Sequence, residues 1–434
     1  MSEMKKNMNV EKESLLASVK PSKAIIDMAV PATLALLAKA VYNIVDTAYI
    51  GMLNSDTALA AVGVTLPLLL IMVSIENIFA AGAGVLAGRQ LGEHDKEGAN
   101  RTVTTIVGFS MVVGIGLCIV GILFEDVLLR AFGASEAVLP QAKDYAFWMF
   151  IAALFNLPAQ SLNCAARAES SVKISSVAVI TGAVLNVILD PIFMFSWGLN
   201  MGVEGASLAT TISQCVTFLI LLIFYMGGFS VIKIKPKYFK LSAKFIWDVV
   251  SIGIPTAVIQ ICLAVATSLT NIAAKTLPDA DLIIAAYGVV QRLILIGCYV
   301  IMGFMQGYQP VASYAFGAKN EERFNESAKF AFKGSLLLPI VVAVIYIALA
   351  KPLILLFNRN PLVVEYGKWL FLSLIRQCLF YVPFILSLPG IMGVKGIYFS
   401  QPAADILTII VCIVLIKPMK RDIIKNMKLD AKYN

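Results

Sequence analysis

The sequence predicts an all-α integral membrane protein with two pseudo-symmetric helical lobes, nominally of six spans each, and about one span missing from the second lobe. Three observations lead to this fold class. Hydrophobic residues form 59% of the 434-residue chain, charged residues form 14%, and the mean hydropathy is +0.83, values outside the range of soluble globular proteins. Apolar segments long enough to cross a bilayer recur along the chain. Two stretches of the first half also recur in the second half.

Each apolar segment is predicted to be a helix. About 20 apolar residues in helical form cross the roughly 30 Å of hydrocarbon, whereas the strands of a barrel would alternate apolar with polar residues. The predicted spans are, in order, residues 24–49, 57–88, 102–124, 143–162, 174–196, 203–227, 245–274, 283–315, 328–350, 362–390 and 396–416. The stretch 362–390 is a poor span, because Arg376 lies near its middle and a lipid-facing cation is costly.

The basic residues orient these spans. Five lysines precede residue 24, whereas the loop near Asn54 carries no basic residue, so the positive-inside rule places the first tail in the cytoplasm. The net charge of +8 arises mostly from basic residues in loops assigned to the cytoplasm. Because topology accounts for this charge, we expect no nucleic-acid partner. The predicted organisation is a cytoplasmic tail at 1–23, a six-helix lobe at 24–228, a basic cytoplasmic linker at 229–244, a lobe of about five helices at 245–416, and a basic cytoplasmic tail at 417–434.

An internal repeat relates the two lobes. "MAVPATLALLAKAVYNIVDTAYIG" resembles "IGIPTAVIQICLAVATSLTNIAAK", and "AGRQLGEHDKEGANRT" resembles "ASYAFGAKNEERFNES", which aligns Gly92 with Gly317 at an offset of 225. An even number of spans in each half makes this a parallel repeat about an axis along the membrane normal. Later the offset falls to 191, where Gly205 aligns with Gly396, so about 34 residues, one helix and one loop, are missing from the second lobe.

A polar cluster interrupts the fifth span. Asn186 and Asp190 stand four residues apart and therefore share one helix face. Pro191 cannot donate a hydrogen bond to the carbonyl of Val187, so a bend and a free acceptor are expected there. An ionisable residue at this depth is costly unless it is neutral, paired or facing a cavity. The alternative is that Asp190 only ends a helix short of the interface.

The first and sixth spans carry further polar groups. Asn43 and Thr47 lie one turn apart with Asp46 beside them, close to an outer loop. The hydroxyl residues at the start of the sixth span are Ser207, Thr210, Thr211 and Ser213. Two acids in one lobe, each with an amide or hydroxyl nearby, predict a shared buried site that takes up a proton or a small cation from either side of the membrane.

Several other residues are candidates for a substrate cavity. Glu76 is a third acid within a span, and bonding at the interface between the lobes is the alternative for it. Gln306, Gln309 and Tyr314 either line the cavity or satisfy the backbone broken at Pro310. We therefore group Asn43, Glu76, Gln306, Gln309 and Tyr314 as cavity candidates. We expect no catalytic residue, no structural metal and no cofactor apart from a coupling ion.

These motifs together resemble the multidrug and toxic compound extrusion (MATE) family over nearly the whole chain. The likeness rests on "IPTAVIQ", "YNIVDTAYIG", "GFMQGYQPVASYAFGAKN" and the tandem of "LNVILDPIF" with "GVEGASLATTIS". The resemblance implies two lobes around a central cavity, alternating access, and antiport of lipophilic organic cations against protons or sodium. It also implies a monomer in the plasma membrane of a bacterial cell, with drug-like small molecules and the lipid bilayer as partners.

The resemblance also implies where the coupling site lies. Carried over by motif, the cation site of the first lobe falls on Asp46, Asn186, Asp190 and Thr210. Another branch of the family uses a glutamate in the seventh span, and its apparent counterpart here is Gln260. Thr270 stands opposite Asp46 in the repeat. We therefore expect the coupling chemistry to lie in the first lobe alone.

Two other functions remain open from the sequence. A flippase for lipids or cell-wall precursors would need a more cationic cavity, for which Lys39, Arg292 and Arg376 are the candidates in the spans. The missing segment of about 34 residues makes an inactive, truncated pump the second alternative. The sequence has no GxxxxGK[ST] motif, so an ATP-driven pump built from this chain alone is disfavoured.

Overall fold

The structure is a computed structural model that describes residues 15–53, 55–254, 256–258, 280–349 and 352. The chain divides into two compact units, Met1–Leu269 with Tyr299–Ala331, and Thr270–Cys298 with Phe332–Asn434. The predicted spans 362–390 and 396–416, and the residues Gln260, Thr270 and Arg376, lie outside the described residues.

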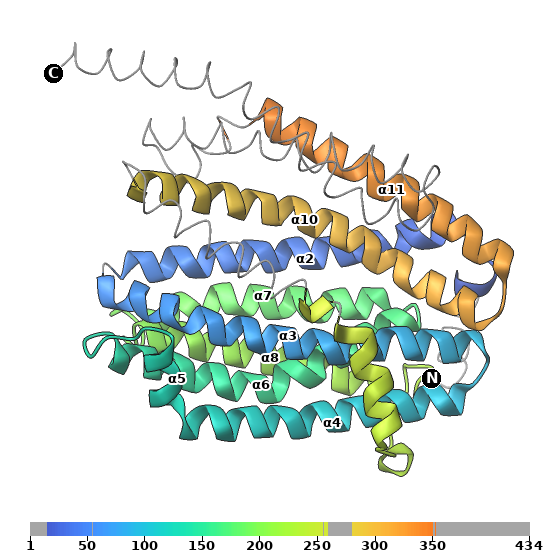
Figure 1. Ribbon diagram of the computed structural model, residues 1–434, viewed down its shortest axis with the longest axis horizontal. Coiled ribbons are helices and arrows are strands. Elements are labelled where there is room, and N and C mark those ends of the chain that lie inside the picture. The colour runs from blue at the N-terminus through green and yellow to red at the C-terminus, as the bar shows by residue number, and fades with distance from the viewer. Residues whose placement is uncertain (1–14, 54, 255, 259–279, 350–351, 353–434) are drawn as a thin grey trace. The chain divides into compact units, whose positions relative to one another are not determined.

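The described chain is helical, as its composition predicts. The helices are α2 (Pro21–Met52), α3 (Asp56–Gly92), α4 (Lys96–Leu123), α5 (Glu125–Ala131), α6 (Leu139–Ala168), α7 (Val172–Met194), α8 (Val203–Met226), the 3-10 turn η1 (Pro236–Tyr238), α10 (Ala280–Gly317) and α11 (Glu321–Ala348). Seven helices in the described part of the chain are long and apolar enough to cross a bilayer. Figure 1 shows α2, α3, α4, α6, α7 and α8 lying with their axes in roughly one direction.

Most of the helices begin before the predicted spans, because hydropathy marks only their apolar parts. The predicted span 102–124 lies within α4 except for its last residue, and α4 begins six residues earlier at Lys96. Asp95 sets that beginning, since its Oδ1 accepts a hydrogen bond of 2.8 Å from the backbone N–H of Gly98. The sequence also missed α5, whose seven residues are too few to show a helical period.

Helix α6 forms the centre of the first lobe, which we define as α2 to α8. It packs against α3, α4 and α8, while α7 packs against α8 and α2. Small residues permit close approach between these helices. A Cβ added at Gly114 of α4 would lie 2.9 Å from the carbonyl oxygen of Ala153 in α6. Val112, Ile115 and Ile119 of α4 are exposed and apolar, as expected of residues that face lipid.

The turn after α3 and the turn after α10 have the same geometry, as the internal repeat predicts. His94 and Lys319 both adopt a positive φ, of 59° and 52°. The next residue caps the following helix in each case: Asp95 accepts from the N–H of Gly98, and the Oδ1 of Asn320 accepts from the N–H of Arg323 at 2.9 Å. The aligned sequences thus encode one helix–turn–helix unit twice.

A buried carboxylate anchors the chain that follows α8. Glu169, just after α6, is buried, and its Oε2 accepts hydrogen bonds from the hydroxyl of Ser230 (2.6 Å) and the backbone N–H groups of Val231 (2.9 Å) and Ile232 (3.1 Å). Its Oε1 accepts from the hydroxyl of Ser171 at 2.9 Å. Charge-assisted hydrogen bonds of this kind are the strong ones, so Glu169 holds the start of the predicted linker against the lobe.

Two side chains of α4 also bind this linker. The Oδ1 of Asn100 accepts from the backbone N–H of Lys233 at 2.6 Å, and the Oγ1 of Thr105 accepts from the backbone N–H of Lys240 at 3.1 Å. The linker is therefore attached to the first lobe along residues 230–240.

Candidate functional site

The polar cluster of the fifth span lies inside the first lobe. Asn186 and Asp190 are almost fully buried in α7, and the Nδ2 of Asn186 donates to the Oδ1 of Asp190 at 3.0 Å. The same Nδ2 donates to the Oγ1 of Thr210 in α8 at 3.2 Å. Helix α7 continues through Pro191 to Met194. Asp190 therefore lies within the helix rather than beyond its end.

Several oxygens of this cluster are buried acceptors without donors. Among the described residues, the Oδ2 of Asp190, the Oδ1 of Asn186 and the Oδ1 of Asp46 have no hydrogen-bond partner. A buried acceptor left without a donor is costly. A proton or a small cation would satisfy these oxygens, because carboxylate and amide oxygens bind both.

Asp46 approaches this cluster from α2, which packs against α7. Its charge interacts electrostatically with Asp190 and with Tyr145. The neighbouring Thr47 donates to the backbone carbonyl of Asn43 at 2.8 Å, which is one turn away, as its spacing predicts. Asn43 is exposed, and among the described residues no hydrogen bond joins its side chain to either acid, so the structure does not bring this cavity candidate to the cluster.

The hydroxyls of α8 have separate roles. Ser207 donates to the backbone carbonyl of Tyr145 at 2.6 Å, and Thr211 donates to that of Trp148 at 2.8 Å, so both fasten α8 to α6. Thr210 alone of these three is hydrogen-bonded to Asn186. The order of the residues in the sequence could not make this distinction.

Glu76 lies on α3 and is buried within the first lobe. Its Oε2 accepts from the Nδ2 of Asn156 at 2.7 Å, and Gln160 also hydrogen-bonds to it. The positive charge of Lys39 acts on the same carboxylate. These contacts place Glu76 in a polar network with α6, separate from the contacts of Asp190.

A polar cavity of about 70 Å³ lies between α2, α6, α7 and α8, with Gln306 of α10 also lining it. Its polar lining includes Lys39, Asn156, Gln160, Asn163, Asn186 and Thr210. Sites for drug-sized ligands usually have volumes of about 300–1,000 Å³. This cavity is therefore large enough for water molecules but not for a drug.

The other cavity candidates lie on α10. Of the three, only Gln306 lines this cavity. Gln309 is half-buried, and its carbonyl accepts from the hydroxyl of Ser313 at 2.8 Å. Tyr314 is buried. The structure therefore does not bring Gln309 or Tyr314 to the cluster at Asp190.

Sequence reasoning missed the polar face of α6. Asn156, Gln160, Asn163 and Arg167 recur at intervals of four, three and four residues, a spacing that places them on one helix face. Asn163 donates to the Oε1 of Gln160 at 3.1 Å, and Arg167 donates to the Oδ1 of Asn163 at 2.7 Å. This spacing could have predicted the polar face from the sequence, because the four polar residues recur on one face of an otherwise apolar helix.

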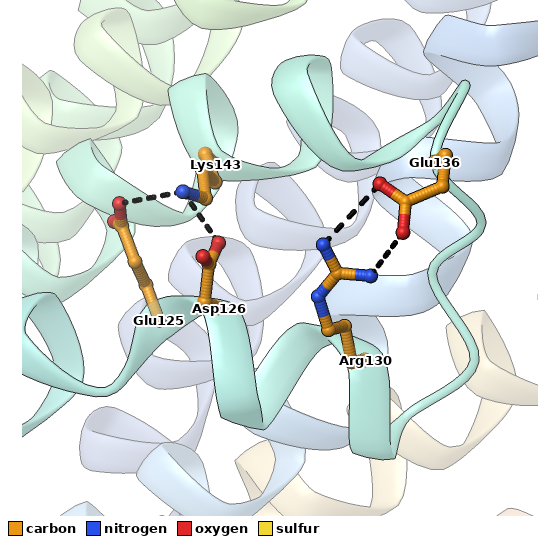
Figure 2. A network of polar contacts seen from close by, with 5 residues as sticks. All are labelled: Glu125, Asp126, Arg130, Glu136 and Lys143. Carbon is orange, nitrogen blue, oxygen red and sulfur yellow. Dashed lines mark hydrogen bonds and ion pairs between the residues drawn. The ribbon is translucent and has the colours of Figure 1, made fainter.

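A second network of charges lies at α5 and is largely exposed (Figure 2). Lys143 forms ion pairs with Asp126 and, at 3.8 Å, with Glu125, while Arg130 pairs with Glu136. The hydrogen bond from Arg130 holds the pKa of Glu136 below its usual value, and partial burial raises the pKa of Glu125. Exposed ion pairs contribute little to stability. We therefore do not regard this network as a functional site, and its carboxylates serve as exposed controls for substitutions of the buried acids.

Comparison with known proteins gives one family. A sequence model of the family described as MatE matches residues 31–192 and 255–415. The chain is 26% identical over 348 residues to the "Multidrug export protein MepA" of Staphylococcus aureus (strain MRSA252), covering 80% of this chain and 76% of that protein. It is 25% identical over 342 residues to the protein of the same name from Staphylococcus haemolyticus (strain JCSC1435), covering 79% and 75%.

Solved structures show the same fold. The "Crystal structure of MATE in complex with MaL6" matches with a TM-score of 0.78 and 22% identity, over 94% of this chain and 99% of that chain. An "Outward-facing conformation of a multidrug resistance MATE family transporter of the MOP superfamily" matches with a TM-score of 0.77 and 22% identity, over 94% and 98%. A MOP superfamily transporter from Pyrococcus furiosus, described by its reversed pocket polarity, matches with a TM-score of 0.76 and 22% identity, over 94% and 98%.

Proposed function

Because this chain belongs to the MATE family of multi-pass membrane transporters, we propose that it exports lipophilic organic cations in exchange for protons or sodium ions. The observation that carries the proposal is the buried Asp190, hydrogen-bonded to Asn186 and with one carboxylate oxygen lacking a partner in the described part of the chain. The experiment that tests it is pH-driven uptake of an organic cation into inside-out vesicles by the Asp190→Asn variant. The chain is a transporter and not an enzyme.

The exchange follows from the chemistry of a buried carboxylate. A negative charge inside the lobe is costly unless a cation neutralises it. Asp46 and Asp190 interact electrostatically, so a proton or sodium ion taken up by one changes the affinity of the other. Binding of the ion from outside and of the drug cation from inside would then alternate, because the same negative charge attracts both.

Substrate recognition through charge has a measurable signature. A permanently cationic dye such as ethidium is expected to bind more tightly to the purified protein at alkaline than at acidic pH, because deprotonated carboxylates attract it. A neutral, similarly flat dye is expected to bind with little pH dependence. Fluorescence titration at several pH values measures both affinities. Parallel pH profiles for the two dyes would contradict recognition by charge.

One observation favours a second candidate, a flippase for lipids or cell-wall precursors. Lys39 and Arg167 line the polar cavity of the first lobe, and cations suit a substrate that carries phosphate. Efflux of a fluorescent cation from energised cells separates the candidates. Efflux supports the multidrug exporter, while movement of a phosphate-bearing lipid without cation efflux supports the flippase. Absence of both supports an inactive pump.

We also propose that both termini are cytoplasmic. The last 18 residues, 417–434, are basic, which favours the cytoplasm. With the tail in the cytoplasm, the stretch 362–390 must enter and leave the membrane from one side. Both segments lie outside the described residues. A cysteine introduced by Asn434→Cys in a chain without other cysteines is expected to resist an impermeant thiol reagent in whole cells. It is expected to react after the cells are opened. Labelling of intact cells would show that the tail had crossed the membrane.

A further inference from the structure

The lining of the polar cavity of the first lobe extends along two helices. On α7 its lining extends from Ser175 to Asn186, and on α6 from Asn156 to Arg167. Eleven residues of helix correspond to about 16 Å along the axis. A volume of about 70 Å³ holds roughly five to seven waters at about 10–15 Å³ each. That number of waters in single file matches the length of the cavity.

Two hydroxyls in this cavity require a partner. Ser176 of α7 and Ser213 of α8 are 4% and 3% exposed, both line the cavity, and neither Oγ atom has a hydrogen-bond partner among the described residues. Buried polar groups are rarely left unpaired. A cavity with polar walls and room for water supplies the missing partners.

The two ends of the cavity differ. At one end Asn186 lines the cavity and donates a hydrogen bond to Asp190. The cavity lining at this end is therefore in direct contact with the carboxylate-bearing side chain. At the other end Asn163 accepts hydrogen bonds from Arg167 and from Ser175. This second end lies where α6 ends and α7 begins. The positive-inside rule, applied to the loops of the first lobe, assigns this end to the cytoplasm.

We propose that this cavity is a water-filled path along which protons pass between Asp190 and the α6–α7 end of the lobe, with Ser176 and Ser213 holding the waters in line. The inference rests on the proposed function and assigns the proton as the coupling ion. At each step one O–H bond breaks and another forms. The first step passes from the Oδ2 of Asp190, which has no partner among the described residues, to a water, because the amide of Asn186 does not relay protons. The proton that leaves the carboxyl group of Asp190 therefore appears in the water beyond Arg167, and no other reactant is consumed.

The hydration of the two ions supports protons over metal cations in this cavity. Lys39 and Arg167 line the cavity, and no aspartate or glutamate of the described chain does so. A sodium ion in the path would lose much of its water shell without gaining a carboxylate ligand, whereas an excess proton moves from one water to the next. Both ions meet the positive charges of Lys39 and Arg167. The same charges make an excess proton short-lived in the path. Asp190 can thus exchange protons with the far end without an open proton channel.

The test compares two residues of equal shape at one position. Ser176→Val removes the hydroxyl, and Ser176→Thr keeps it, while valine and threonine have nearly the same volume. In proteoliposomes, we expect Ser176→Val to slow pH-driven uptake of a fluorescent organic cation about tenfold, the effect of one lost hydrogen bond in a rate-determining path. We expect Ser176→Thr to remain close to the wild type. Exchange of labelled for unlabelled cation at equal pH needs no net proton movement and should be the same in both.

The same pair of substitutions at Ser213 provides a second, independent position. Equal pH-driven rates for the valine and threonine variants at both positions would overturn the path. Loss of cation exchange as well in both valine variants would show that the hydroxyls are structural and would overturn it too. Sodium-driven uptake without pH-driven uptake in the wild type would overturn the path alone. Absence of both pH-driven and sodium-driven uptake would refute the proposed function itself, and the path with it.

Discussion

Replacing Asp190 with asparagine is expected to reduce pH-driven uptake of an organic cation into inside-out vesicles to the background rate, while the protein remains in the membrane. The substituted amide keeps the size of the side chain and one oxygen to accept from Asn186. It cannot release or bind a proton. A site that exchanges a proton for a drug would then lose its driving reaction, because only a titrating group links the two.

The controls for this experiment come from the same chain. Glu136→Gln makes the same change from carboxylate to amide on an exposed side chain paired with Arg130, and it should leave uptake unchanged. Asp46→Asn should resemble Asp190→Asn, because the two acids are proposed to act as one coupled site. Uptake at the wild-type rate by Asp190→Asn would remove Asp190 from the coupling mechanism.

The second large effect is expected at Glu169, where Glu169→Gln should destabilise the protein in detergent. The substitution places an amide group against the donors of Ser230, Val231 and Ile232, or leaves them unpaired. Loss of charged hydrogen bonds to buried donors costs roughly 3 kcal/mol in the free energy of unfolding. A fall of several degrees in the thermal midpoint is expected, with faster tryptic cleavage after Lys233 and Lys237.

A matched variant tests whether burial is responsible. Glu97→Gln changes an exposed carboxylate whose contact with Arg101 is 3.9 Å, and its thermal midpoint should be close to that of the wild type. If Glu169→Gln had the same midpoint and the same cleavage rate as Glu97→Gln, the linker would not depend on the buried carboxylate.

Much of the fold could be predicted because it depends on local patterns. The length of an apolar run predicts a helix across the membrane, and the spacing of Asn186 and Asp190 predicts that they contact each other. The aligned motifs around Gly92 and Gly317 predicted two equivalent turns, and His94 and Lys319 have the same left-handed backbone. In each case residues close together in the chain determine the result.

The tertiary structure decided which helix faces meet. Spacing could not select Thr210 over Ser207 as the partner of Asn186, nor show that Asn43 stands apart from the acids, because each choice depends on how α2, α7 and α8 pack. The contact between Glu169 and Val231 joins residues 62 positions apart, and no local pattern encodes such a distance. By itself the sequence determined the membrane setting, the long membrane-spanning helices of the first lobe and the acids that interrupt them. Only the packing of those helices determined the cavity and its polar lining, since a cavity is made by side chains from separate helices and not by any one of them.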